Sequence, residues 1–133
     1  TASEKFLLRN QRRTLAENVE AQRGMLQLYR DNGVAVERAS IMAAFGCNFE
    51  GDIPTERVLE MVGTTMDLGD EFGLTIKTVS LADTMAWATP ADVTRVVSAV
   101  RNASRKSSGT RSAEGAVQVF FVTGGKRACW STS

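Results

Sequence analysis

The apolar residues of the first hundred positions switch between helical and strand-like patterns. Apolar side chains spaced three and four apart predict amphipathic helices over 14–31, 54–72 and 90–100. Between them, 34–44 and 74–81 are rich in apolar and β-branched residues and are expected to be strands. Helices and strands that alternate with short loops are typical of βαβ units. The sequence therefore predicts an α/β fold with a parallel sheet.

Local signals mark the ends of these helices. Thr14 and Glu17 are spaced as a capping box, in which each side chain bonds to the backbone of the other. Gly33 is suited to the left-handed conformation that ends a helix. Pro54 and Pro90 stand where a first helical turn begins, a position that favours proline.

Loops that follow parallel strands open on one edge of the sheet, where ligand sites lie. The loops after Ala44 and Leu81 are expected at this edge, together with residues 1–6 if a strand precedes them. Their polar, reactive or aromatic residues are the candidates for a site: Glu4, Cys47, Glu50, Ser80, Asp83 and Trp87.

Each candidate also has a structural interpretation. Asp83 ends an apolar strand, so it either lines a site or caps a turn. Cys47 is either part of a site or a small packed residue. Ser80 either donates to a substrate oxygen or is an ordinary strand residue, and Trp87 either covers a ligand or packs. Glu4 and Glu50, the acidic residues of the predicted loops, are either catalytic or solvated.

Composition narrows the chemistry. The 133 residues are 43% hydrophobic and 23% charged, as in a single globular domain. The sequence has no histidine, which excludes Ser-His and Cys-His pairs and removes the commonest metal ligand. Two cysteines without a CxxC spacing do not make a zinc site. No membrane span or secretory leader is predicted, so reduced thiols and a cytoplasmic location are expected.

The character of the chain changes near residue 102. Residues 102–133 are Ser-rich and basic, and from residue 101 onward six basic residues stand against the single acid Glu114. A basic tail can bind nucleic acid, but this one has no recognition motif, and nucleic acid is the less favoured partner. Residues 117–122 fit one strand, although the tail does not follow the βα order. We divide the chain into 1–101 and an atypical tail at 102–133, out of frame or disordered.

Several segments carry a family resemblance when taken in order. They are 2–4, Asn10, 45–51, 80–84 and 89–90, which read ASE, N, FGCNFEG, SLADT and TP. With them, residues 1–101 resemble the middle of a hydroxymethylglutaryl-CoA lyase-like protein, from the metal-dependent lyases and condensing enzymes on a TIM barrel. The resemblance implies a partial (β/α)8 barrel of about three βα units, with the atypical tail behind it.

The resemblance also implies an activity. It is metal-dependent carbon–carbon cleavage of a 3-hydroxy-3-methylglutaryl-CoA-type thioester to an acyl-CoA and a keto acid, with Mg²⁺ or Mn²⁺ as Lewis acid. An acyl-CoA is the implied substrate. The implied catalytic residues are Asp83, beside the reacting oxygens, with Ser80 and Thr84. The implied substrate-binding residues at the rim are Ser3, Glu4 and Cys47.

The chain also departs from the family. Ala82 replaces the usual Gly before the Asp-Thr pair, and Asn48-Phe49 replaces Pro-Tyr. The family's metal ligands, an Asp on the first strand and a His-x-His on the seventh, are absent. We therefore expect a fragment, frame-shifted near residue 102 and inactive alone. Open strand edges favour self-association, including a homo-oligomer.

Two other functions remain open at this point. One is a fragment of a condensing enzyme of the isopropylmalate or homocitrate synthase kind, which shares the metal and the barrel. The other is a small α/β binding module that uses its basic tail.

Overall fold

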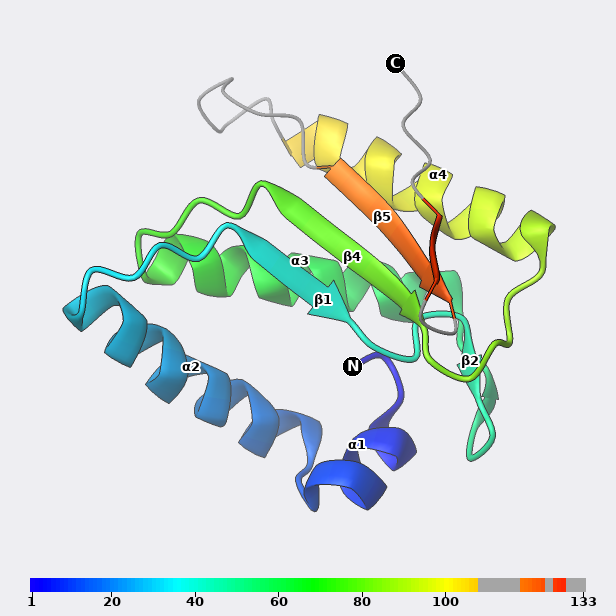
Figure 1. The fold of residues 1–133 in the computed structure, drawn as a ribbon, viewed down its shortest axis with the longest axis horizontal. Helices are drawn as coiled ribbons and strands as arrows, with labels where there is room; N and C mark the ends of the chain where they lie inside the picture. The colour runs from blue at the N-terminus through cyan, green and yellow to red at the C-terminus, as the bar shows by residue number, and fades with distance from the viewer. Residues whose placement is uncertain (108–117, 124–125, 129–133) are drawn as a thin grey trace.

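The computed structural model describes residues 1–107, 118–123 and 126–128, and it confirms the α/β fold (Figure 1). Its elements are α1 (Glu4–Gln11), α2 (Leu15–Asp31), β1 (Arg38–Ile41), β2 (Gly46–Cys47), β3 (Gly51–Asp52), α3 (Thr55–Glu71), β4 (Thr78–Asp83), α4 (Pro90–Ser107), β5 (Gln118–Thr123) and β6 (Lys126–Ala128).

The main sheet has the strand order β1-β4-β5-β6. Strand β4 pairs in parallel with β1 on one side and with β5 on the other, and β6 returns antiparallel to β5. The strand expected at 117–122 is present as β5, one residue further along. It continues the βα order beyond α4, which the sequence pattern did not show. The short β2 and β3 form a separate antiparallel hairpin.

Two helices cover one face of this sheet. Val79 and Leu81 of β4 are fully buried and pack in one cluster with Val58 of α3 and with Val96 and Val100 of α4. Figure 1 shows α3 and α4 lying on the same side of the strands. Because side chains alternate along a strand, Ser80 belongs to the opposite face. The apolar faces of the helices and of β4 therefore form one hydrophobic core.

Helix α2 packs through a second, smaller cluster. Leu26 of α2 meets Leu68 and Phe72 at the end of α3, and all three are buried. The predicted capping box of α2 is confirmed, with both bonds between Thr14 and Glu17 formed. Gly33 follows the helix with φ +66°, the left-handed conformation expected of it.

The strands are shorter than the sequence pattern predicted. The segment 34–44 contributes only β1, which begins at Arg38 and ends at Ile41. The strand does not continue further because Ala43 has φ +51° and the chain turns there. Segment 74–81 begins its strand only at Thr78 and continues to Asp83. Helix α1 and the β2–β3 hairpin were not expected at all.

The proposed division at residue 101 stays a prediction. Helix α4 runs from Pro90 to Ser107, past this point. Most of residues 108–133, on which the tail hypothesis depends, lies outside the described residues. Among the described helices, none is long and apolar enough to span a membrane.

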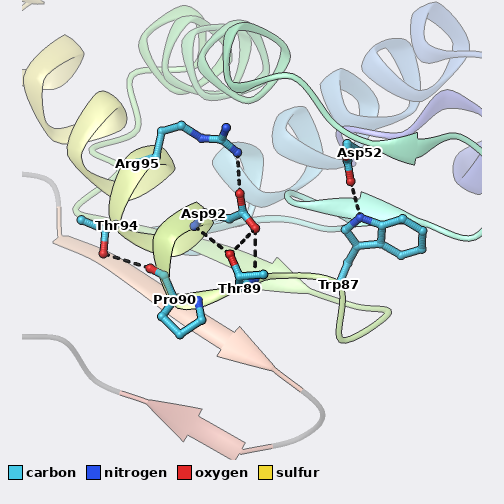
Figure 2. Close-up of polar contacts among 7 residues, drawn as sticks. All are labelled: Asp52, Trp87, Thr89, Pro90, Asp92, Thr94 and Arg95. Carbon is cyan, nitrogen blue, oxygen red and sulfur yellow. Dashed lines mark hydrogen bonds and ion pairs between the residues drawn. The ribbon is translucent and has the colours of Figure 1, made fainter.

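A second capping box starts α4 (Figure 2). The Thr89 backbone N–H donates to Asp92 Oδ2 at 3.0 Å, and the Asp92 N–H donates to Thr89 Oγ1 at 3.3 Å. The Thr89 hydroxyl also donates to Asp92 Oδ2 at 2.6 Å. This hydroxyl bond, followed by the backbone bond, lowers the pKa of Asp92 below its ordinary value. The charged carboxylate thus favours the folded state.

This cap makes stability depend on pH in the acid range. A pKa lowered by folding stabilises the protein above the unfolded value, about 3.9 for Asp, and the stabilisation disappears as pH falls through the folded value. We expect Asp92→Asn to lower the melting temperature at pH 6 and to have a smaller effect at pH 2.5. Glu56→Gln is the control, because no side chain caps the start of α3. An equal effect of Asp92→Asn at both pH values would contradict the assignment.

Candidate functional site

The loops after β1 and β4 meet at the carboxyl edge of the sheet, as predicted. The Ala44 N–H donates to the Ala82 carbonyl at 3.0 Å. The Ala43 N–H donates to Thr84 Oγ1 at 2.9 Å. Ala43 is fully buried with φ +51°, a conformation that costs a non-glycine residue about 1 kcal/mol or more. The hydroxyl of Thr84 offsets this cost by binding the backbone of the strained turn.

The N-terminal segment joins the same edge. The Ala2 N–H donates to the Met42 carbonyl at 2.9 Å. The next residue, Ser3, is fully buried and caps α1 by accepting the Phe6 N–H at 3.1 Å. Three chain segments therefore surround one edge, which is the arrangement expected for a site.

Ser3 links this segment to the β2–β3 hairpin. Its hydroxyl donates to the Glu50 carboxylate and lies 3.0 Å from Cys47 Sγ. A hydroxyl has one proton and two lone pairs. Since the proton goes to Glu50 and one lone pair accepts the Phe6 N–H, the contact with sulfur is a bond donated by the Cys47 thiol. The order of donation is Cys47 to Ser3 to Glu50.

Ser3 and Glu4, the two polar residues predicted at the N-terminal rim, have different environments. Ser3 contacts Cys47, whose side chain is fully buried and thus matches the packed alternative. Glu4 is exposed in the first turn of α1. Their roles in substrate binding stay a prediction.

Asp83 caps the turn that follows β4. Its side chain is 2% exposed, and its two carboxylate oxygens accept the N–H groups of Trp87, at 2.7 Å, and Ala88, at 3.1 Å. This is the turn-capping arrangement that the sequence left open. A catalytic role for Asp83 stays a prediction.

Ser80 lies apart from Asp83. The two residues are three apart on one strand, so their side chains project to opposite faces of the sheet. Ser80 is half-buried and stands in register with Ser40 of β1 and Phe120 of β5. Ser80 therefore shares the end of β4 with Asp83 and Thr84, but its side chain lies on the opposite face of the sheet from that of Asp83.

Trp87 fastens the loop after β4 to the hairpin. Its indole Nε1 donates to Asp52 Oδ1 at 2.5 Å, a contact drawn in Figure 2. Its ring also lies against Gly46, where a Cβ atom would come within 2.3 Å of the ring. These contacts fit the packing alternative for Trp87. Asp52 was not predicted from the sequence, because it lies 35 positions from Trp87 and carries no local signal.

The described residues do not fit a divalent metal ion. Among them, no group of three or more Cys, Asp or Glu side chains is placed to hold one, and the sequence has no histidine. The acids nearest this edge bind protein groups: Glu50 binds Ser3, Asp52 binds Trp87, and Asp83 binds two backbone N–H groups.

Known structures share this arrangement of elements. Over 90% of this chain, an HMG-CoA lyase from Brucella melitensis superposes with a TM-score of 0.68 at 22% identity. HMG-CoA lyases from Bacillus subtilis and Pseudomonas aeruginosa superpose with TM-scores of 0.67 and 0.70, each at 24% identity. The chain has the fold of part of an HMG-CoA lyase. This confirms the predicted partial (β/α)8 barrel.

The match covers most of this chain but only about a third of each HMG-CoA lyase. The chain spans 37% of the Brucella lyase and 35% of each of the other two. No protein-family profile and no curated protein matches it. At this level of identity the HMG-CoA lyases establish the fold of the chain, and the activity is a separate inference.

Gly46→Ala tests the contact with Trp87. The added methyl group would overlap the indole ring, so we expect Trp87 to leave Asp52 and stability to fall by about 1–3 kcal/mol. Red-shifted tryptophan emission in a Trp130→Phe background would report the displacement. Gly63→Ala is the control, because nothing lies within 4 Å of its Cβ position. An unshifted emission maximum in Gly46→Ala would refute the contact.

Ser3→Ala tests the link between α1 and the hairpin. It removes the cap of Phe6 N–H and the partners of Cys47 and Glu50, so we expect a loss of about 1–3 kcal/mol. The midpoint of urea unfolding measures this loss. Ser98→Ala, at an exposed position of α4, is the matched control. Equal midpoints for the two variants would mean that the buried bonds of Ser3 contribute nothing.

Proposed function

We propose that this chain is part of a lyase that cleaves a carbon–carbon bond in a 3-hydroxy-3-methylglutaryl-CoA-type thioester, giving an acyl-CoA and a keto acid. The supporting observation is the fold shared with three HMG-CoA lyases over 90% of the chain. In addition, residues 2–4, 45–51 and 82–84, which carry the sequence resemblance, adjoin one edge of the sheet.

In this proposal Asp83 stands beside the reacting oxygens. Two backbone N–H groups, of Trp87 and Ala88, fix the orientation of its carboxylate. Thr84 positions the neighbouring turn through Ala43, and Ser80 lines the open face of β4. Ser3, Glu4 and Cys47 shape the rim that faces the acyl group.

The reaction in this proposal uses a divalent metal ion, which supplies Lewis-acid polarisation of the substrate oxygens. The described residues form no site for that ion, so the proposal assigns no metal ligand to them. We accordingly expect no turnover by the 133-residue chain alone.

A chimera tests the function directly. Residues 1–107 of this chain replace the structurally matched segment of the Bacillus subtilis HMG-CoA lyase, and keto-acid release from HMG-CoA is measured with Mg²⁺. We expect cleavage by the chimera and a loss of about 100-fold or more in kcat with Asp83→Asn, because positioned acid–base groups contribute at least that much. Asp31→Asn, an exposed charge at the end of α2, is the matched control.

Three results would contradict parts of the proposal. A chimera that folds, as judged by circular dichroism, but does not cleave HMG-CoA would exclude the function. Full activity of Asp83→Asn would exclude the role of Asp83. Metal-dependent turnover by the isolated chain would exclude its expected inactivity.

A further inference from the structure

The chain makes a strained turn between Asp83 and Trp87. Ala86, in the middle of this turn, has φ +53°, a left-handed conformation that costs a non-glycine residue about 1 kcal/mol or more. Within the turn, the Ala86 N–H donates to the Asp83 carbonyl at 3.4 Å, a longer bond than the usual one of about 2.9 Å. A strained turn persists only where the surrounding structure holds it. Contacts from outside the turn are therefore needed to keep it in place.

The direction of the Asp83 carboxylate depends on this turn. Its Oδ1 accepts the Trp87 N–H at 2.7 Å, and its Oδ2 accepts the Ala88 N–H at 3.1 Å. Both donors are backbone groups of the residues that follow the strained position. If residues 87 and 88 shift, the carboxylate loses these bonds or shifts with them.

The side chain of Trp87 connects the turn to the β2–β3 hairpin. Its indole Nε1 donates to Asp52 Oδ1 at 2.5 Å, and Figure 2 shows the ring pointing to this carboxylate. The same ring occupies the space that a Cβ atom at Gly46 would need. Gly46 and Asp52 face each other as partners in the hairpin, so both contacts fall on one rung. Close packing and a directional hydrogen bond together fix the position of the ring.

The hairpin is itself attached to the body of the protein. Cys47, in β2, is fully buried, and its sulfur lies 3.0 Å from the hydroxyl of Ser3. After β3, the Ile53 N–H donates to the Phe45 carbonyl at 3.2 Å. The hairpin is thus a fixed support, and Trp87 transmits its position to the turn after β4.

We propose that Trp87 is a positioning residue for Asp83. Its side chain, anchored on Gly46 and Asp52, holds the strained turn whose N–H groups orient the Asp83 carboxylate. The inference rests on the proposed function, in which Asp83 stands beside the reacting oxygens. It adds a residue that acts on the reaction only through Asp83. Because a displacement of about 1 Å in a reacting group can lower the rate about 100-fold, a loosened turn lowers kcat.

Amide hydrogen exchange on the full chain, followed by NMR, tests the anchor. We expect Asp52→Ala to speed the exchange of the Trp87 and Ala88 amides about threefold to tenfold, because the loss of one hydrogen bond releases the turn. Asp52→Asn is expected to restore slow exchange, since its amide oxygen still accepts the indole N–H. Glu56→Ala, at another exposed acid, is the matched control. Asp52 is exposed, so its variants keep the core.

Kinetics of the chimera test the effect on the reaction. We expect Trp87→Phe and Asp52→Ala each to lower kcat for HMG-CoA about tenfold, with KM changed by about twofold at most, because only the orientation of the reacting carboxylate changes. Asp52→Asn is expected to keep kcat, and Glu56→Ala to leave it unchanged. In an Asp83→Asn background, Trp87→Phe is expected to cause no further loss, because Trp87 acts through Asp83.

The inference is overturned if Asp52→Ala leaves the exchange of residues 87 and 88 unchanged, or if an active chimera keeps its kcat with Trp87→Phe. Equal losses from Trp87→Phe with and without the Asp83 carboxylate would also overturn it, because they would assign Trp87 to stability alone. Failure of the proposed function gives a different result. A folded, inactive chimera would exclude the lyase activity, while faster exchange in full-chain Asp52→Ala would still support the control of Asp83 by Trp87.

Discussion

The parallel pairing of β4 along both of its edges is the constraint on which the other parts of the structure depend. It sets Ile41 opposite Leu81 on one side and Leu81 opposite Phe121 on the other. The same strand buries Val79 and Leu81 against α3 and α4. A one-residue slip in its register would turn these apolar side chains to the opposite face, so the core and the register enforce each other.

The geometry of the candidate site depends on this strand register. Once β1 and β4 are aligned, their loops begin side by side, and Ala44 reaches the carbonyl of Ala82. Thr84 then binds the backbone of Ala43, which holds a left-handed turn that an alanine would not keep alone. The positions of Ser3 and Cys47 follow, because both belong to segments attached to this turn. The strain of Ala43 is thus maintained by the tertiary structure around it.

Local signals predicted the parts of the fold that are decided locally. The boundaries of α2 followed from Thr14, Glu17 and Gly33, which act within one turn of the helix. The end of β1 could not be predicted from local signals, because the turn at Ala43 depends on Thr84, 41 positions away. The hairpin was missed because its strands have two residues each. The sequence predicted the edge of the sheet at which the loops after β1 and β4 meet, but it left the hydrogen-bond partners of the residues in these loops open.

The distribution of charged groups at this edge has a consequence for the ligands it accepts. Glu50, Asp52 and Asp83 all serve as hydrogen-bond acceptors for groups of the protein. Carboxylates occupied in this way stabilise loops, but they do not gather into the cluster of oxygens that a divalent cation requires.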